Sequence, residues 1–283
     1  MILFKKADSL NQWIDAQQRK GLKAGFVPTM GALHPGHISL IESSRKDNDI
    51  TISSIFVNPT QFNDPKDFEK YPVTIENDIL QLEQAGCDIL FLPEVDEIYP
   101  NGIAPTQYYD LGELETLLEG KFRPGHYQGV CQVVHRLLEI VQPDNLYLGQ
   151  KDYQQCMVIT RLVELMGKKE ATNINICPTL READGLAMSS RNMRLSLAER
   201  RKAVLIFQSL SFIKNNLVSG ETETIKNKAI AMLTREGFRV DYIEIADAKT
   251  LKAVNNWDGK KKLVALAAAF LNEVRLIDNL LLN

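Results

Sequence analysis

The chain has 283 residues, of which 45% are hydrophobic and 24% are charged, the composition of an ordinary globular protein with a buried core. Its formal net charge is −3, so the protein as a whole does not attract nucleic acid or an anionic membrane surface. No segment approaches the length of a membrane span, and the apolar start is too short for a signal peptide. We therefore expect a soluble cytoplasmic protein with one large domain, or a large domain and a small one.

The first 180 or so residues alternate short apolar runs, typical of buried parallel strands, with helical patterns. Strands are predicted at residues 25–28, 50–57, 88–92, 145–148 and 173–177. The clearest helix has an apolar face from Val130 to Val141 and stops before Pro143. This alternation predicts an α/β domain whose parallel sheet is wrapped by helices, and such sheets bind ligands beyond the carboxyl ends of their strands.

The pattern changes after Asn192. Ser196 and Glu199 are spaced as a capping box, which predicts a long helix to about Leu217, and a second helix is expected at 225–236. Three β-like runs follow at residues 240–246, 262–270 and 274–282, and the last two predict a hairpin. We expect a large domain at residues 1–184 and a smaller α+β domain at residues 185–283.

The four cysteines form no Cys-x-x-Cys pair; they are Cys87, Cys131, Cys156 and Cys177. Three of them interrupt apolar runs, which favours small buried side chains over metal ligands or disulfide bridges. A reducing compartment, the cytoplasm, is the default expectation for such a chain.

Two of the four histidines, His34 and His37, lie in the stretch VPTMGALHPGH, which joins the first predicted strand to a helix. Gly31 and Gly36 allow close approach of the backbone to a ligand, and Gly36 tolerates an unusual φ at the turn. His37 lies at the helix N-terminus, where free N–H groups favour an anion, and both imidazoles can donate to phosphate. The alternatives are a metal pair, for which no third ligand is evident nearby, and a purely structural turn.

The stretch ADGLAMSSRN follows the last predicted parallel strand. Ser189, Ser190 and Arg191 offer two hydroxyls and a guanidinium, a set suited to clamping phosphate. The Ser-Ser-Arg sequence is also common in linkers, so its placement after a strand is what favours a binding role.

The stretch LGQKDYQQ also follows a strand directly. Lys151 can place a charge on phosphate, and Asp152 can accept from a ribose hydroxyl or orient the lysine. The alternative is an exposed helix start with Asp152 as its cap.

Two further loops carry polar side chains. VNPTQF places Asn58 and Gln61 at the end of the second predicted strand, where neither amide has an evident structural need. FRPGHYQG places Arg123 and His126 on a glycine-punctuated loop that is typical of a mobile lid. The fourth histidine, His135, lies within a predicted helix and is interpreted as a surface or packing residue.

Together these stretches resemble the pantothenate synthetase family, the pantoate–β-alanine ligases. VPTMGALHPGH and READGLAMSSRN are similar to its two nucleotide signatures, and SIFVNPTQF and GQKDYQQ to its substrate segments. RLIDN, near the end of the chain, is also similar to the family. The resemblance spans nearly the whole chain and implies a Rossmann-like parallel-sheet domain of the nucleotidylyltransferase type.

The resemblance implies an ATP-dependent reaction in which the pantoate carboxylate attacks the α-phosphorus, giving pantoyl adenylate and pyrophosphate. The amine of β-alanine then attacks the acyl carbon, giving pantothenate and AMP for coenzyme A biosynthesis. Mg²⁺ is implied, held mainly by the ATP phosphates, with no dedicated metal ligands in the protein. The family also implies a homodimer formed through the larger domain, and no nucleic-acid or membrane partner is expected.

Residue roles are carried over from the family position by position. The implied catalytic residues are His34, His37, Lys151, Ser189, Ser190 and Arg191. The implied ATP-binding residues are Met30, Gly31, Ala32, Leu33, His34, Pro35, Gly36, His37, Gly149, Gln150, Lys151, Asp152, Leu180, Met188, Ser189, Ser190 and Arg191. The implied binding residues for the other two substrates are Gln61, Gln155, Met30, Asn58 and Arg123. Of these, Gln61 and Gln155 match the pantoate-binding glutamines, and Gln61 also lies near the β-alanine site.

Two of these positions depart from the family's common residues. Leu180 stands where valine is frequent, but the implied contact with adenine is made by its backbone and survives the change. Gln150 stands where glutamate is frequent, so it is given no charged role.

Three other functions remain open. Another nucleotidylyltransferase would join a nucleotide to a phosphorylated acceptor, whereas Gln61 and Gln155 favour a hydroxy-carboxylate without a phosphate. A tRNA synthetase is disfavoured by the acidic pI of about 5.9 and by the lack of a basic patch. A non-catalytic nucleotide sensor would be expected to lose His37, Lys151 or the Ser-Ser-Arg set, and all are present.

Overall fold

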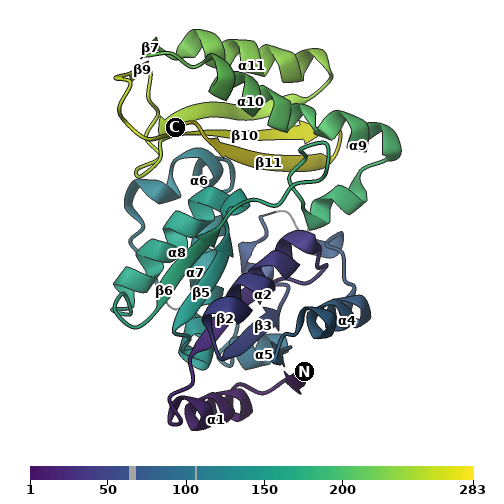
Figure 1. Ribbon diagram of the computed structural model, residues 1–283, viewed down its shortest axis with the longest axis vertical. Helices are drawn as coiled ribbons and strands as arrows, with labels where there is room; N and C mark the ends of the chain where they lie inside the picture. The colour runs from purple at the N-terminus through teal and green to yellow at the C-terminus, as the bar shows by residue number, and fades with distance from the viewer. Residues whose placement is uncertain (64–67, 106) are drawn as a thin grey trace. The chain divides into compact units, whose positions relative to one another are not determined.

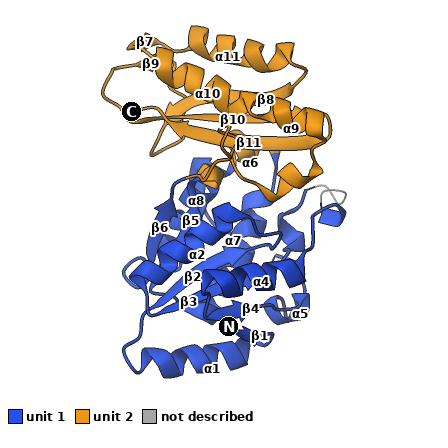
Figure 2. Cartoon of the chain, turned by 45° about the vertical axis from the view of Figure 1, so that its right-hand side comes forward, with its two compact units in different colours: residues 1–115, 123–150, 155–178 blue, residues 116–122, 151–154, 179–283 orange. Residues whose placement is uncertain are grey.

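The computed structural model describes residues 1–63, 68–105 and 107–283, which form two compact units (Figures 1 and 2). Unit 1 consists of residues 1–115, 123–150 and 155–178. Unit 2 consists of residues 116–122, 151–154 and 179–283. Two short segments, residues 116–122 and 151–154, are therefore separated in the sequence from the rest of their unit.

Unit 1 is built on a six-stranded parallel sheet with the order β1-β4-β3-β2-β5-β6. The strands are β1 (Ile2–Phe4), β2 (Ala24–Thr29), β3 (Ile50–Ile55), β4 (Ile89–Phe91), β5 (Asn145–Gly149) and β6 (Asn173–Cys177). The helices are α1 (Ala7–Gln18), α2 (Pro35–Asp47), α4 (Ile75–Ala85), α5 (Val95–Ile98), α7 (His126–Val141) and α8 (Tyr153–Leu165), which begins in unit 2. The five predicted strands are confirmed; β1 was not predicted, because three residues are too few to show a pattern.

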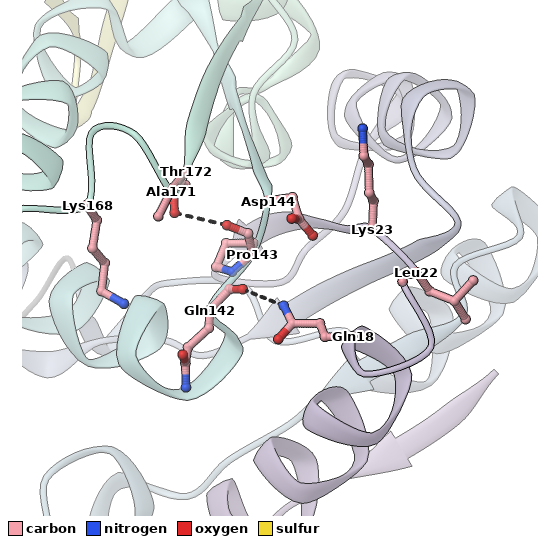
Figure 3. A pocket seen from close by; sticks show the side chains of 10 residues that line it. Gln18, Leu22, Lys23, Gln142, Pro143, Asp144, Lys168, Ala171 and Thr172 are labelled. Carbon is pink, nitrogen blue, oxygen red and sulfur yellow. Dashed lines mark hydrogen bonds between the residues drawn. The ribbon is translucent and has the colours of Figure 1, made fainter.

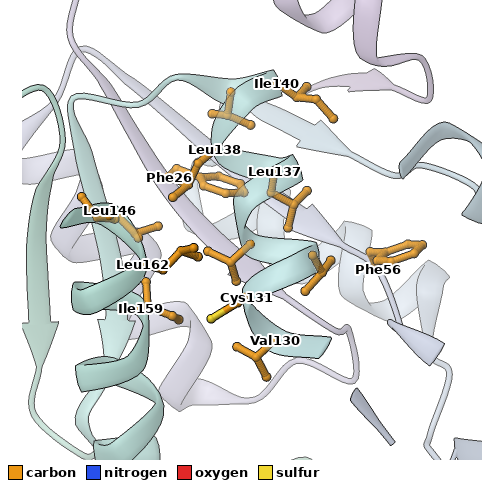
Figure 4. Packing of buried hydrophobic residues seen from close by; sticks show 14 of the residues in the cluster. Phe26, Phe56, Val130, Cys131, Leu137, Leu138, Ile140, Leu146, Ile159 and Leu162 are labelled. Atoms are coloured by element: carbon orange, nitrogen blue, oxygen red, sulfur yellow. The ribbon is translucent and has the colours of Figure 1, made fainter. Parts of the chain in front are cut away.

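Each face of the sheet has its own hydrophobic core, because successive side chains of a strand point to opposite faces. On one face Phe26 and Leu146 pack with α1, α7 and α8 (Figure 4). On the other face Val27 and Tyr147 pack with α2 and α4. The sheet is thus covered on both sides, which explains why its strands read as nearly continuous apolar runs.

Helix α2 lies unusually close to the sheet at Gly25 of β2. A Cβ atom added at Gly25 would lie 2.2 Å from Ser44 Oγ and 2.5 Å from Asn48 Nδ2, so no larger residue fits without a shift. Ser44 also shares a buried hydrogen bond of 2.8 Å with Thr51 of β3. These contacts fix α2, and hence its N-terminus, against the sheet.

Unit 2 contains a three-stranded antiparallel sheet, β11-β10-β8, and a two-stranded ribbon. The strands are β7 (Gly220–Glu221), β8 (Arg239–Asp247), β9 (Asn256–Trp257), β10 (Leu263–Leu271) and β11 (Val274–Leu281). The helices are α6 (Leu118–Phe122), α9 (Leu197–Ala203), α10 (Leu205–Asn216) and α11 (Glu223–Arg235). The predicted β10–β11 hairpin is confirmed, as is the capping box of Ser196 and Glu199. The predicted long helix is divided at Val204 into α9 and α10.

Helix α6 joins unit 2 through a buried ion pair. Arg275 of β11 donates two hydrogen bonds of 2.7 Å to the Glu119 carboxylate and one of 2.8 Å to Asp241. Tyr242 also donates to Glu119, at 2.9 Å. The Arg275 side chain is 17% exposed, so this bidentate contact is largely removed from water. A segment 156 residues away in the sequence is thereby tied to β11.

The core of unit 1 can be tested at Leu138 of α7, which is fully buried. We expect Leu138→Ala to lower the free energy of unfolding by about 2–5 kcal/mol, because the substitution removes buried contacts and leaves a cavity. The matched control is Leu80→Ala on α4, where the side chain is 51% exposed and the change should stay within about 0.5 kcal/mol. Urea unfolding followed by circular dichroism measures both. Equal losses for the two variants would contradict this packing.

Candidate functional site

Strands β2 and β5 are neighbours at the centre of the sheet, and the chain leaves them toward opposite faces. After β2 it enters α2, which packs on one core, and after β5 it enters α8, which packs on the other. Such a reversal of strand order is where open α/β sheets bind their ligands, at the carboxyl ends of the strands. The loop at residues 30–34 and the turn at 150–152 lie at these ends.

A depression of about 440 Å³ lies at the other end of these strands, away from the two loops (Figure 3). It is lined by residues that precede β2, β5 and β6, among them Lys23, Asp144 and Thr172. The Asp144 carboxylate accepts a hydrogen bond of 2.7 Å from the backbone N–H of Ala24. This depression lies at the amino ends of the strands and contains none of the predicted site residues.

His34 caps the N-terminus of α2. Its Nδ1 accepts the backbone N–H of Gly36 at 3.1 Å, and Pro35 is the first helical residue. A backbone N–H can only donate, so a neutral His34 ring carries its proton on Nε2. The His37 ring lies in the first turn of the helix, with its centroid 4.0 Å from that of His34. The prediction that one imidazole lies in the loop and the other at the helix start is confirmed.

The unusual backbone of this loop lies at Gly31 and Ala32, with φ angles of +80° and +49°. Gly36 would tolerate a special φ but does not take one, because it is already inside the regular helix. Alanine is uncommon in the left-handed region, so something must hold Ala32 there.

Asp78 of α4 provides this restraint. Its carboxylate accepts the backbone N–H groups of Ala32 at 2.9 Å and Leu33 at 2.8 Å, and the Thr74 hydroxyl at 3.0 Å. The Asp78 side chain is fully buried. Asp78 was not predicted from the sequence, because acidic residues are common in the first turn of a helix. Glu76 lies in the same turn, so nothing local distinguishes Asp78.

The turn at Pro59–Gln61 follows β3 and is fixed by Asn58. The Asn58 side chain accepts from Thr60 and Tyr99 and donates to Gly129 O at 3.2 Å. Asn58 is 1% exposed, so the expectation that this amide has no structural need is wrong.

Arg123 and His126 hold the same turn from the other side. His126 Nδ1 lies 2.8 Å from the carbonyl oxygen of Gln61, and Arg123 Nη2 donates to that oxygen at 3.3 Å. Helix α7 approaches so closely that a Cβ on Gly129 would lie 2.2 Å from Thr60 O. Arg123 therefore contacts the backbone of a predicted substrate residue.

The Gln61 side chain reaches the loop that follows β2. Its Nε2 lies 2.9 Å from Met30 Sδ, and its Oε1 accepts from Asn58 Nδ2 at 3.1 Å. Unit 1 therefore brings together Met30, Asn58, Gln61 and Arg123. Gln155 lies half-buried on α8, and Gly149 ends β5.

The predicted residues of unit 2 lie on two segments. Lys151 Nζ lies 3.6 Å from the Asp152 carboxylate, within a turn before α8. Ser189 caps the turn at Ser190–Arg194, its hydroxyl accepting the N–H of Arg191 at 3.3 Å. Ser190 is buried.

Leu180 and Met188 precede this serine turn. The backbone N–H of Met188 donates to the carbonyl of Leu180 at 3.1 Å, so the two residues lie on paired backbone segments. The Leu180 side chain is 40% exposed, which suits a residue whose implied contact uses the backbone.

Burial raises the pKa of the Cys87, Cys131 and Cys177 thiols, which disfavours the reactive thiolate form. Cys87, Cys131 and Cys156 are buried, as predicted, and burial raises the pKa of the Cys87 and Cys131 thiols to about 12. Among residues 1–63, 68–105 and 107–283, no cluster of three or more His, Cys, Asp or Glu side chains could hold a metal ion. The polar groups of these loops are instead imidazoles, hydroxyls, amides and cations, which suit oxyanions.

In the part of the chain that the structure describes, no helix combines the length and the apolar character needed to cross a membrane.

The hold of Asp78 on the loop can be measured by Asp78→Asn. The amide has one acceptor oxygen and presents an N–H group, so at least one buried backbone donor loses its partner. We expect the free energy of unfolding to fall by about 1–3 kcal/mol. Glu76→Gln, in the same helical turn but exposed, is the control and should change little. Equal unfolding midpoints in urea for the two variants would show that Asp78 does not restrain the loop.

Comparisons with known proteins agree on one family. The family model described as pantoate-beta-alanine ligase matches residues 2–281. A pantothenate synthetase of Bacteroides thetaiotaomicron is 45% identical over 271 residues, which cover 94% of each chain. The crystal structure of pantothenate synthetase from Thermus thermophilus has a TM-score of 0.90 at 38% identity and 99% coverage of both chains. A Francisella tularensis pantoate-beta-alanine ligase, complexed with beta-gamma ATP and beta-alanine, has a TM-score of 0.81 at 39% identity, covering 99% of this chain and 97% of its own. The chain therefore belongs to the pantoate–β-alanine ligase family.

Proposed function

We propose that this ligase condenses pantoate with β-alanine in two steps, through a pantoyl adenylate formed from ATP. The observation that carries this proposal is the contact of Gln61 with Met30, because it joins a predicted pantoate residue to the predicted ATP loop. The related Francisella tularensis enzyme was crystallised with beta-gamma ATP and beta-alanine, which supports both as substrates here.

The first step attaches a leaving group to pantoate, because a free carboxylate is a poor acylating agent. A carboxylate oxygen bonds to the α-phosphorus of ATP, and the bond to the departing pyrophosphate breaks. Negative charge grows on the α-phosphate and the pyrophosphate. The Nε2–H of His34 and the His37 ring are the unit 1 donors for this charge; Lys151, Ser189, Ser190 and Arg191 are those of unit 2. Removal of one such preorganised donor commonly costs about 3 kcal/mol of transition-state stabilisation.

The second step forms the amide bond. The amine of β-alanine attacks the acyl carbon of the adenylate, AMP leaves with the electrons of the acyl–oxygen bond, and the amine loses a proton. Holding the two reactants side by side is worth up to about 7–11 kcal/mol, so this step needs little further catalysis. Gln61 is suited to hold them, because both its backbone and its side chain are fixed. No covalent enzyme intermediate is required.

Mg²⁺ would be held by ATP phosphates and water, because the donors on these loops suit phosphate oxygens rather than a hard cation. When bound, it would neutralise part of the phosphate charge. We further propose that the protein acts in the cytoplasm as a homodimer and supplies pantothenate for coenzyme A. The homodimer and the link to coenzyme A come from the family resemblance, and the cytoplasmic location comes from the cysteine usage of the sequence.

The adenylate step is tested by pyrophosphate release from ATP with and without pantoate, in the absence of β-alanine. We expect release that depends on pantoate and precedes any added amine. No release, or release that requires a phosphorylated acceptor instead, would refute the proposed function.

His37→Ala should slow this release by about a hundredfold or more, because it removes a donor aimed at developing charge. His135→Ala is the matched control. That histidine lies on α7, where its Nδ1 is 3.1 Å from the Tyr109 hydroxyl, away from the loop. We expect near-normal release from the control and near-wild-type circular dichroism from both variants. A fully active His37→Ala would remove this histidine from the mechanism.

A further inference from the structure

We propose that Asn279 of β11 is a positioning residue that acts through Lys151, and that Asp278 beside it places the segment leading to Ser189. This inference rests on the proposed function, because it assigns Lys151 and Ser189 to the ATP site. In this proposal Asp278 and Asn279 do not touch substrate themselves.

The first contact joins Asn279 to Lys151. The Asn279 side chain donates its Nδ2–H to the backbone carbonyl of Lys151 at 2.8 Å, and Asn279 is 2% exposed. Lys151 lies in a three-residue 3₁₀ turn between the end of β5 and the start of α8. The hydrogen bond holds the backbone of this turn at Lys151 itself, and therefore limits where its ammonium group can reach.

The second contact joins Asp278 to Arg181. The Asp278 carboxylate is 3% exposed and receives a bidentate pair from Arg181, at 2.6 and 3.0 Å. Arg181 also donates to the carbonyls of Gly185 and Asn279, both at 3.1 Å, and its guanidinium lies 4.2 Å from the centre of the Phe207 ring. All these contacts fix one arginine in a single orientation.

Arg181 in turn fixes the turn that precedes Ser189. The backbones of Arg181 and Ala187 form an antiparallel bridge, and the carbonyl of Gly185 at the tip of the turn accepts from the Arg181 side chain. Gly185 has φ +100° and would place a Cβ 2.3 Å from the Phe207 ring, so the turn has little freedom. Ser189 lies two residues after Ala187, so the bridge holds the backbone just before it.

Two adjacent residues of one strand therefore hold both unit 2 segments of the proposed ATP site. They are also linked to each other, because Arg181 donates to the carbonyl of Asn279 while the Asn279 amide donates to Lys151. Loss of the Asn279 amide should displace Lys151 without dismantling the β11 ladder, which is made by backbone groups.

The test is a double-mutant cycle on the single-turnover rate of pantoate-dependent pyrophosphate release. The variants are Asn279→Ala, Lys151→Ala and the double variant. We expect Asn279→Ala to lower the rate at saturating ATP and pantoate by about tenfold or more. If Asn279 acts through Lys151, adding Asn279→Ala to Lys151→Ala should lower the rate less than twofold further. If Asn279 had a purely structural role, the rate of the double variant would instead fall by the product of the two single-variant factors.

Asn283→Ala is the matched control. Asn283 also donates its Nδ2–H to a lysine carbonyl of unit 2, that of Lys261 at 3.0 Å, but this lysine has no proposed role. We expect a near-wild-type rate for this variant. Thermal unfolding of every variant checks the fold, and Asn279→Ser replaces Asn279→Ala in the cycle if the latter unfolds below the assay temperature.

The outcomes separate the two proposals. Multiplying losses in the cycle, or an Asn279→Ala rate within twofold of wild type, would overturn the positioning role while leaving the ligase reaction intact. A wild-type protein that releases no pyrophosphate with pantoate would refute the proposed function, and the positioning role with it.

Discussion

The loops of the candidate site have buried or partly buried backbone groups that no helix or sheet satisfies, and side chains from distant elements satisfy them. Asp78 accepts the N–H groups of Ala32 and Leu33, and His126 contacts the carbonyl of Gln61. Asn279 does the same for the carbonyl of Lys151. A buried backbone group without a partner costs free energy comparable to a lost hydrogen bond, so each loop is stable in one shape only with its distant partner present. The conformation of the site therefore depends on residues that do not face the ligand.

Much of the fold could be predicted from the sequence, because its signals are local. Apolar runs identified β2 to β6, the spacing from Val130 identified α7, and the Ser196–Glu199 box marked the start of α9. The break at Val204 could not be predicted, since the apolar pattern continues across it. Residues 116–122 belong to unit 2, where Glu119 pairs with Arg275, and no local pattern encodes that contact.

In the candidate site, too, the features with a local sequence signal could be predicted and those that depend on tertiary contacts could not. Its loops were found because polar residues and glycines follow apolar runs, and the family resemblance supplied an ATP role for them. Their supporting residues were given no role: Asp78 is ordinary in its local sequence, and Asn279 was noted only within RLIDN, a stretch similar to the family. Only tertiary contact shows what the two residues hold. Asn58 was found for the wrong reason, because its amide shapes the turn that presents Gln61. Family membership does not replace this geometry, since function depends on the site rather than on the fold.

The ion pair between Glu119 and Arg275 has a consequence for how such proteins can be recombined. The chain passes from one unit to the other after residues 115, 122, 150, 154 and 178. A chimera made by a single crossover near residue 178 would take Arg275 from one parent and Glu119 from the other. If the second parent lacked the carboxylate, the buried guanidinium would lose two of its three hydrogen bonds to carboxylates. Removal of one partner from a buried ion-pair network is strongly destabilising, even with Asp241 still in place, so the C-terminal part of the chain is not an interchangeable module. Its compatible partners are those that carry an acidic side chain at the position of Glu119.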